Sequence, residues 1–393
     1  MTVPADGRGW QFDHIDPALP PRMNEVFGAI RERCPIVHSD RHGGFWAVLS
    51  HDAVRQAALD TRTYSSVGGV TLPRVIDDRK PPVDFDPPEH THYRRFIQRN
   101  FTRQAVARFE GPLRELVERR ITELVGKGHA DLATELARHV PPAAIAMILG
   151  LPPEDGELFV SFTTRIFVAV AAGDHEAGRS ANQEFRSYLA GQVERLRDAG
   201  QDCLINEITG GRVDGKPLPL PEQLAMLQML VMAGHETTVN GIGTMLYRLA
   251  TVDGLRRRLV EGPGLIPRMI DECLRIDSPV IAIARTVQGE AELAGQDLLD
   301  GDRVVFVLSS ANRDPAVFDR PDEFVCPRRE GPQVAFGLGV HRCLGEHLAL
   351  LEMRIVAEEI LRLAPDYRLA DGFAPQWIPG RMMRGLAGLP VNF

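Results

Sequence analysis

The stretch FGLGVHRCLGEHL, Phe336 to Leu348, places a cysteine among glycines just ahead of an apolar helical pattern. A free cysteine is most often a small buried hydrophobic residue, and this interpretation of Cys343 stays open. A dinucleotide-binding fingerprint begins similarly, but its third glycine would fall on Arg342. The stretch also lies too near the end of the chain for the strand that such a fold needs downstream.

A metal ligand is the interpretation that the local chemistry favours. The pattern from Leu344 to Leu363, ended by Pro365, predicts a helix, and free N–H groups at a helix amino terminus stabilise a thiolate. Glycines at 337, 339 and 345 remove the side chains that would keep a flat macrocycle away from the sulfur. A soft thiolate held in this way suits iron.

Length and composition narrow the class of protein. The 393 residues are 44% hydrophobic, enough for a large core, and no long linker divides them, so we expect one domain over 1–393. A net charge of -8 argues against nucleic acid as a partner. The amino terminus has no apolar signal-like core, and no window reaches the roughly 18 apolar residues of a membrane span. We therefore expect a soluble, cytoplasmic protein.

The cysteines give no sign of a disulfide framework. The pattern speaks against structural zinc as well, because the five cysteines form no CxxC pair and have no neighbouring histidine at zinc-ligand spacing: Cys34, Cys203, Cys273, Cys326 and Cys343. Any cysteine chemistry must therefore use one thiol.

Helix is the predominant expectation for secondary structure. Helical periodicity covers 103–126, 180–199 and the long segment from Pro221. Short strand-like runs, punctuated by Gly and Asp, occur early, at 43–54, and late, in ARTVQGEAELAGQDLLDGDRVVFVLSSANRD. The sequence therefore predicts a mainly α fold with a minor β component towards the two ends of the chain.

The stretch FGLGVHRCLGEHLA resembles the cysteine-ligand loop of the cytochrome P450 family, the haem-thiolate monooxygenases. The resemblance implies that Cys343 is the axial ligand of the haem iron and that Phe336 packs beside its sulfur, with Gly345 next to the cofactor. It also implies a triangular-prism fold that holds haem b between the helix at 221–250 and the helix after Cys343. The order of motifs is that of bacterial members.

The helix predicted from Pro221 to Ala250 is apolar nearly all round, with a polar island at its middle. Its acid, Glu236, is costly to bury unless used or paired. Thr237 could simply bond back to a carbonyl of the preceding turn. The run AGHETT from Ala233 also resembles the family's oxygen-activation motif, in which a local bulge opens a groove over the haem. The resemblance implies that Ala233 borders the cofactor, Thr237 stabilises the bound dioxygen and Glu236 relays protons.

Glu272 and Arg275 stand three residues apart in a predicted helix, which usually means a surface pair. Periodicity favours that interpretation, because both residues fall off the apolar stripe. Yet the pair resembles the family's ExxR ion pair, which is buried and holds the meander, the segment before the cysteine loop that is similar here to ANRDPAVFDRPDEF, 311–324. The frequent Pro-Glu-Arg-Phe of that meander reads PDEF at 321–324, so the third member of the network is unassigned.

A macrocycle with two propionates needs directional cations. The run DPPEHTHYR, 86–94, resembles the family motif whose His and Arg contact a propionate, which here implies His90 and Arg94. Arg285 and His341 match the family's other propionate contacts. Each alone would more often be a solvated charge.

The resemblance implies insertion of one oxygen atom from dioxygen into an organic substrate, with electrons from a ferredoxin and its reductase. By analogy the pocket draws on mostly apolar segments, which favours a small hydrophobic molecule: 65–85, 158–173, Leu230 and Ala233, 280–283, and Met382 with Met383. A basic face of Arg95, Arg99 and Arg342 is expected to receive an acidic ferredoxin. A peroxide-using haem-thiolate enzyme and a non-catalytic haem sensor or carrier remain alternatives.

Overall fold

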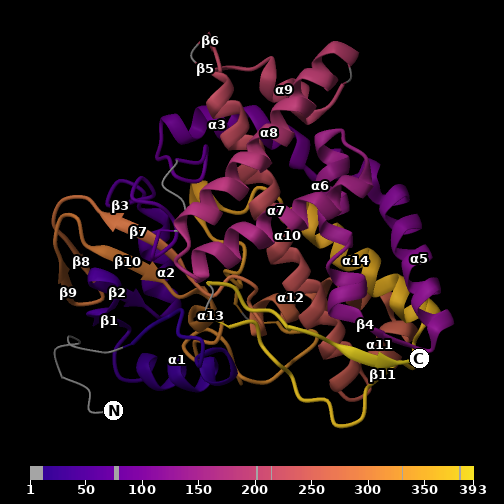
Figure 1. Ribbon diagram of the computed structural model, residues 1–393. Coiled ribbons are helices and arrows are strands. Elements are labelled where there is room, and N and C mark those ends of the chain that lie inside the picture. Colours follow the sequence, from indigo (N-terminus) through magenta and orange to yellow (C-terminus); the bar gives the residue numbers. More distant parts are fainter. Residues whose placement is uncertain (1–11, 75–78, 201, 214, 330, 380–381) are drawn as a thin grey trace.

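The computed structural model describes residues 12–74, 79–200, 202–213, 215–329, 331–379 and 382–393, and helix predominates in them (Figure 1). The α-helices have these bounds: α1 Met23–Arg31, α2 His51–Leu59, α3 Glu89–Ile97, α4 Arg103–Val106, α5 Glu110–Lys127, α6 Val140–Leu149, α7 Gly156–Ala171, α8 His175–Ala199, α9 Leu204–Thr209, α10 Leu220–Thr251, α11 Leu255–Glu261, α12 Ile266–Ile276, α13 Leu308–Ala311 and α14 Glu346–Leu363. The mainly helical prediction is confirmed.

The largest sheet has five strands in the order β1-β2-β10-β7-β3. They are β1 Ile36–Ser39, β2 Phe45–Val48, β3 Tyr64–Ser65, β7 Ile283–Val287 and β10 Arg303–Phe306. Only the β2–β10 pair is parallel, with Val305 opposite Ala47. The early and late strand-like runs of the sequence are therefore neighbours in space.

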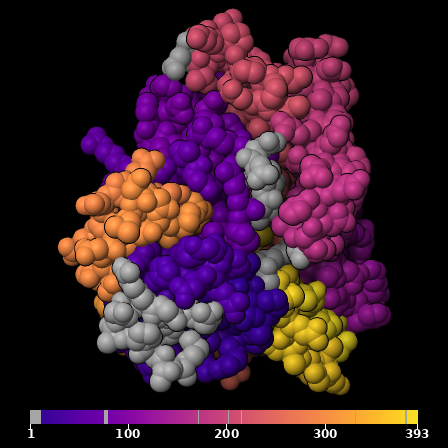
Figure 2. Space-filling view, turned by 60° about the vertical axis from the view of Figure 1, so that its left-hand side comes forward, coloured from indigo at the N-terminus to yellow at the C-terminus, as the bar shows by residue number. Residues whose placement is uncertain are grey.

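The remaining strands are short. One three-stranded sheet has the order β11-β12-β4, from Arg368–Leu369, Pro390–Asn392 and His129–Asp131. Two hairpins complete the set: β5 Arg212–Val213 with β6 Lys216–Pro217, and β8 Ala291–Leu293 with β9 Gln296–Leu298. In Figure 2 the indigo amino-terminal part lies between the orange β8–β9 region and the yellow carboxyl-terminal segment.

Some predicted boundaries are wrong. The strand-like run at 43–54 is β2 followed by the start of α2, because Ser50 caps that helix and accepts a hydrogen bond from the Ala53 amide at 3.4 Å. The helix predicted at 103–126 is divided into α4, a 3₁₀ turn at Ala107–Phe109 and α5. The helix predicted at 180–199 begins earlier, at His175.

The central helix α10 crosses the middle of the molecule and packs against α6, α12 and α14 (Figure 1). A Cβ atom on Gly234 would lie only 2.4 Å from Cδ1 of Ile145 in α6, so this glycine lets the two helices approach closely. The described helices include none that is long and apolar enough to cross a membrane.

Candidate active site

The cysteine loop folds back on itself before α14 begins. The Cys343 amide donates a hydrogen bond of 2.7 Å to the Phe336 carbonyl, which closes the loop. Gly337 and Gly339 have φ values of 68° and 63°, in the left-handed region that favours glycine. At Gly339 a Cβ atom would also lie 3.2 Å from the Ala58 carbonyl. These glycines therefore serve the turn itself.

Helix α14 begins at Glu346, two residues later than predicted, with Gly345 as its N-cap. The Gly345 amide still donates a hydrogen bond to the sulfur of Cys343. Cys343 is an exposed residue, but burial of its sulfur raises the pKa of the thiol above its ordinary value. The Gly345 amide, Arg94 and Arg342 oppose the rise. A metal ion bound here would deprotonate the thiol outright.

Two arginines and two histidines gather beside the cysteine loop. His90 and His341 lie with ring centroids 4.3 Å apart. Burial, followed by Arg285, His90 and Arg94, lowers the pKa of His341 to about 2. Burial and then Arg94 lower the pKa of His90 to about 4. Such mutual effects require the four groups to lie close together, so the structure brings together the residues predicted to contact the propionates.

The predicted ion pair is buried. Glu272 and Arg275 in α12 meet in two hydrogen bonds of 2.7 and 2.8 Å, and both side chains are at most 2% exposed. Arg275 also donates to the carbonyls of Asn312 and Pro321, at 2.9 and 2.7 Å. The surface position that helical periodicity favoured is wrong, because the meander covers this face of α12.

A third charged residue joins that pair. Arg328 donates to both Glu272 oxygens, at 3.0 Å from Nε and 3.2 Å from Nη2, and its side chain is 6% exposed. The PDEF stretch at 321–324, where this member was expected, does not contain it; Arg328 stands four residues further on. Beyond it, the Val334 amide donates 2.7 Å to Oδ1 of Asn312, whose carbonyl Arg275 holds. The ion-pair network is thus connected to the start of the cysteine loop.

Helix α10 carries the polar island, but without the expected bulge. The segment around Glu236 and Thr237 is α-helical throughout. The Thr237 hydroxyl donates to the Ala233 carbonyl at 3.2 Å, which is the back-bonded arrangement that the sequence left open. This bond satisfies the hydroxyl without opening the helix. Glu236 is partly buried, and Ala233 is exposed.

His235, which sequence analysis passed over, fixes the helix that carries this island. Its Nδ1 lies 2.7 Å from the Val231 carbonyl, and its Nε2 lies 3.1 Å from the Thr163 hydroxyl of α7. The side chain is 4% exposed. His235 therefore ties α10 to α7, whose residues belong to the predicted pocket.

Comparisons with known proteins agree with this geometry. Residues 264–363 match the family model described as Cytochrome P450. The chain is 30% identical to the polyketide biosynthesis cytochrome P450 PksS of Bacillus subtilis, over 93% of this chain and 95% of the relative. The chain belongs to the cytochrome P450 family. It is also 32% identical to the vitamin D(3) 25-hydroxylase of Pseudonocardia autotrophica, over 89% of this chain and 88% of the relative.

The fold of the P450 family is present as well. The solved structure of PksS superposes with a TM-score of 0.88 at 28% identity, covering 97% of this chain and 99% of that chain. The protein is a cytochrome P450 monooxygenase of a bacterial type, and the family's cofactor is haem b.

The side chains fit a haem in this P450. Nδ1 of His90 is buried and has no hydrogen-bond partner among the described residues. Arg285 is 5% exposed, and burial lowers its pKa to about 10, although Asp86 opposes this. The Asp86 carboxylate is itself occupied by the Ser65 hydroxyl and the Ser66 amide, at 2.5 and 2.9 Å. The cluster therefore keeps the excess of donors and positive charge that two propionates require.

Ser66 is a further member of this cluster that the sequence did not single out. Its hydroxyl lies 3.1 Å from Nε2 of His341, so it connects Asp86 to the histidine. Asp86 is the first residue of the DPPEH motif, so the sequence did point to it. Ser66 lies twenty residues earlier, and no motif marks it.

The predicted basic face is weaker than expected. Arg342 is paired with Glu346 through two hydrogen bonds of 2.6 and 2.7 Å. Arg99 lies beyond α3, in the 3₁₀ helix Gln98–Phe101, and pairs with Glu207 at 3.2 Å. Arg95 is exposed, with no ion-pair partner among the described residues. Glu346, four residues after Arg342, and Glu207, which is distant in sequence from Arg99, account for this difference.

Proposed function

We propose that this P450 oxidises a largely hydrophobic small molecule, using dioxygen and electrons from a ferredoxin with its reductase. One observation carries the proposal of a shared pocket wall: backbone hydrogen bonds join the predicted segment 280–283 to Met382 and, through the adjoining Ala284, to the segment 65–85. The Ala284 amide donates to Val70 at 2.8 Å, and the Ile281 amide donates to Met382 at 2.8 Å. Residues 75–78 of the first segment lie outside the described residues.

The character of these segments supports an apolar substrate. Val280, Ile283, Met382 and Met383 are each partly exposed next to a buried apolar core. Methionines adapt to irregular shapes. The names of the two curated relatives refer to polyketide biosynthesis and to vitamin D(3), and a bulky lipophilic molecule of that kind suits this chain.

The residues of this chain would have separate roles in binding the haem and in handling protons. Cys343 would bind the iron of a haem, with Phe336 and Gly345 beside it, and His90, Arg94, Arg285 and His341 would bind its propionates. The haem supplies the oxygen chemistry when bound. Glu236 would pass protons inward from solvent, and the Thr237 hydroxyl, which now donates to the Ala233 carbonyl, would turn to donate its hydrogen into the site where dioxygen reacts.

The ferredoxin proposal rests on the surface around Arg95. Helix α14, which follows Cys343, packs against α4 and the 3₁₀ helix Gln98–Phe101, so α3 and α4 flank the side of the molecule that carries Cys343. Arg103 and Arg108 there are exposed, as is Arg95. An acidic partner would be steered to these three arginines despite the net charge of -8. We further propose that residues 1–393 act as one catalytic domain in the cytoplasm.

Reconstituted turnover tests this proposal. Hydrophobic compounds are titrated until one shifts the haem spectrum, and its oxidation is then followed with ferredoxin, reductase and reduced nicotinamide. We expect oxygen-dependent product, with a rate that falls as ionic strength rises. Arg95→Glu should slow electron transfer about 10-fold or more at low salt. Arg179→Glu, an exposed arginine on α8, is the control and should change little. Rates indifferent to salt and to Arg95→Glu would contradict the docking surface.

One observation keeps a second function in view. Because α10 is unbroken at Thr237 and the hydroxyl is back-bonded, a peroxide-using haem-thiolate enzyme fits the same geometry. Product formed from hydrogen peroxide without ferredoxin, at a rate above that with dioxygen, would favour it. A haem that binds ligands but yields no product under either condition would favour the sensor or carrier.

A further inference from the structure

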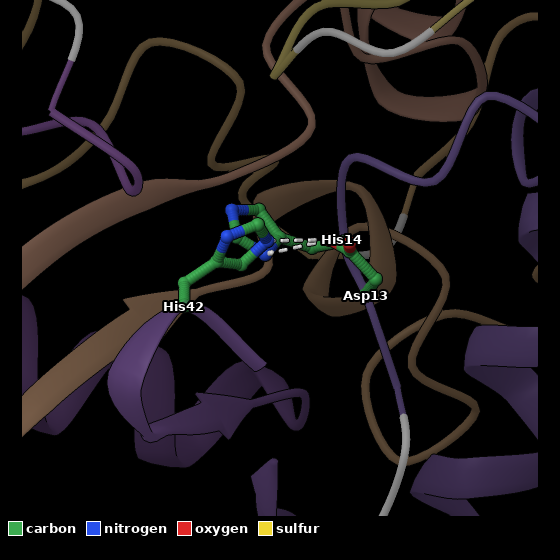
Figure 3. A group of neighbouring side chains, drawn as sticks. All are labelled: Asp13, His14 and His42. Atoms are coloured by element: carbon green, nitrogen blue, oxygen red, sulfur yellow. Dashed lines mark hydrogen bonds and ion pairs between the residues drawn. The ribbon is translucent and has the colours of Figure 1, made fainter. Parts of the chain in front are cut away.

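Away from the haem site, three side chains with metal-binding atoms meet where the amino-terminal segment crosses the β1–β2 turn (Figure 3). Asp13 and His14 precede α1, and His42 lies in the 3₁₀ turn Arg41–Gly43. Their nearest ligand atoms all lie within 4.8 Å of one another. Oδ1 of Asp13 is 2.9 Å from Nε2 of His42 and 4.0 Å from Nδ1 of His14.

His14 decides what this cluster can bind. Its side chain is fully buried, and Nε2 lies 2.8 Å from the Leu72 carbonyl. A carbonyl can only accept, so Nε2 carries the proton and Nδ1 presents a lone pair. Nδ1 has no hydrogen-bond partner in the described part of the chain. It faces Oδ1 of Asp13 at 4.0 Å, and a carboxylate has no hydrogen to donate to it.

The surroundings hold the ligands in place. Oδ1 of Asp13 accepts a hydrogen bond from the Ile15 amide at 3.0 Å. The Ser39 hydroxyl of β1 donates to the Phe12 carbonyl at 2.5 Å, which fixes the segment beside the hairpin. The Leu72 carbonyl accepts the hydrogen bond from Nε2 of His14 and so orients its ring. Metal-ligating histidines are commonly oriented by such a bond from the nitrogen that does not bind the metal. Only His42 lies on the exposed turn.

We propose that Asp13, His14 and His42 bind one divalent transition-metal ion of the zinc class. Two imidazole nitrogens and one carboxylate oxygen are a common donor set for Zn²⁺, with water in the fourth position. Ligands on a tetrahedral zinc are about 3.3 Å apart, and the two distances from Asp13, 2.9 and 4.0 Å, lie on either side of that value. A modest movement of the exposed turn completes the geometry.

The ion would connect three parts of the molecule. Asp13 and His14 belong to the amino-terminal segment and His42 to the β1–β2 turn, while His14 holds the carbonyl of Leu72. Leu72 belongs to the segment 65–85 that is proposed to line the substrate pocket. Metal binding would thus stabilise the amino-terminal segment against that wall, without touching the haem cluster.

Metal content measured on the haem-loaded enzyme, with any affinity tag removed, tests the site. The protein is stripped with a chelator, equilibrated with zinc chloride, freed of loose metal by gel filtration and assayed for zinc per chain. We expect one zinc per chain in the wild type and a thermal midpoint about 2 °C higher than without zinc. The variant His42→Ala should lose the zinc and this increase.

His38 provides the matched control. It lies on the same hairpin, is 24% exposed against 21% for His42, and stands 3.4 Å from a carboxylate of its own, Asp40. His38→Ala should keep the zinc. Asp13→Asn, which preserves the size of the side chain, should weaken binding roughly 10-fold or more. No zinc in the wild type, or equal zinc in wild type and His42→Ala, would overturn the proposal in favour of a plain hydrogen bond between Asp13 and His42.

Discussion

Arg328, just after the meander, and Arg275 in α12 both donate hydrogen bonds to the Glu272 carboxylate, with their Nε atoms 3.0 and 2.7 Å from the same oxygen. The carboxylate therefore holds two arginines from segments more than fifty residues apart. Removing Arg328 leaves a buried acid only partly compensated. Arg328→Ala should cost about 3–5 kcal/mol of stability, the usual range for breaking a buried pair.

Unfolding of the haem-loaded enzyme in denaturant checks this value. Arg329, the next residue, is exposed and serves as the matched control, since Arg329→Ala should change stability by no more than about 0.5 kcal/mol. Equal losses in the two variants would show that the third member of the network lies elsewhere.

The cations beside the cysteine loop should govern how firmly haem is held. Arg94 lies close enough to lower the pKa of His90 and His341, whereas Arg95, its neighbour in α3, is exposed. Charged hydrogen bonds contribute roughly 1.5–3 kcal/mol, so Arg94→Leu should speed haem loss about 10- to 100-fold. Transfer of haem to an excess of apomyoglobin measures this rate. Arg95→Leu should leave it unchanged, and equal rates for the two variants would remove Arg94 from the haem site.

Glu352 on α14 predicts an unusual dependence of stability on pH. The side chain is 1% exposed, neither carboxyl oxygen has a hydrogen-bond partner among the described residues, and burial raises its pKa well above the usual range. Below the unfolded pKa both states are protonated. Above it the unfolded chain releases a proton that the folded chain keeps, so stability falls as pH rises, by up to about 1.4 kcal/mol per pH unit.

Glu352→Gln removes this ionisation. Denaturant unfolding from about pH 5 to about pH 7 should therefore show the variant gaining stability over the wild type as pH rises. Glu261→Gln, on the exposed end of α11, should follow the wild type throughout. Parallel curves for Glu352→Gln and the wild type would mean that Glu352 is ionised and paired in the folded enzyme.

Thr237 should control how efficiently electrons are used. Thr237→Ala removes the hydroxyl proposed to orient the oxygen ligand, so oxygen uptake should continue while hydrogen peroxide replaces product, with a loss of product of roughly 10²-fold. Thr244 makes the same back-bond two turns further along α10, to the Asn240 carbonyl at 3.0 Å, and Thr244→Ala is the matched control. Product per reduced nicotinamide is measured on a true substrate. Full coupling in Thr237→Ala would make Thr237 a purely structural helix residue.

Sequence alone predicted the parts of this molecule that depend on local chemistry. The apolar pattern of α10 is long and uniform, so its bounds were predicted to within one residue, and the cysteine loop needs glycines at fixed positions. Helix 103–126 was predicted as unbroken because the 3₁₀ turn at 107–109 leaves no breaker residue in the sequence. The α10 bulge was wrong because it came from resemblance, whereas this chain satisfies Thr237 within an intact helix.

The contacts that sequence could not predict are mainly those between residues distant in the chain. Nothing in the residues near Arg99 shows that it pairs with Glu207. The same holds for Asp13, His14 and His42, since only the hairpin β1–β2 brings His42 back to the amino-terminal segment. Glu346, by contrast, lies only four residues after Arg342, and this spacing was a signal that the sequence analysis missed. The cysteine spacing spoke against a structural zinc site built on cysteines, but it gives no information on a site made only of histidine and aspartate.

The spectrum of the reduced enzyme with carbon monoxide shows whether Cys343 is the ligand of the haem iron. If Cys343 ligates the haem iron, freshly prepared enzyme shows the red-shifted Soret band of thiolate-bound haem, and Cys343→His abolishes it while still binding haem. Cys326→Ser, at a partly buried cysteine just after the meander, should retain the band. A wild-type spectrum typical of histidine ligation, or an unchanged band in Cys343→His, would show that Cys343 is not the ligand of the haem iron.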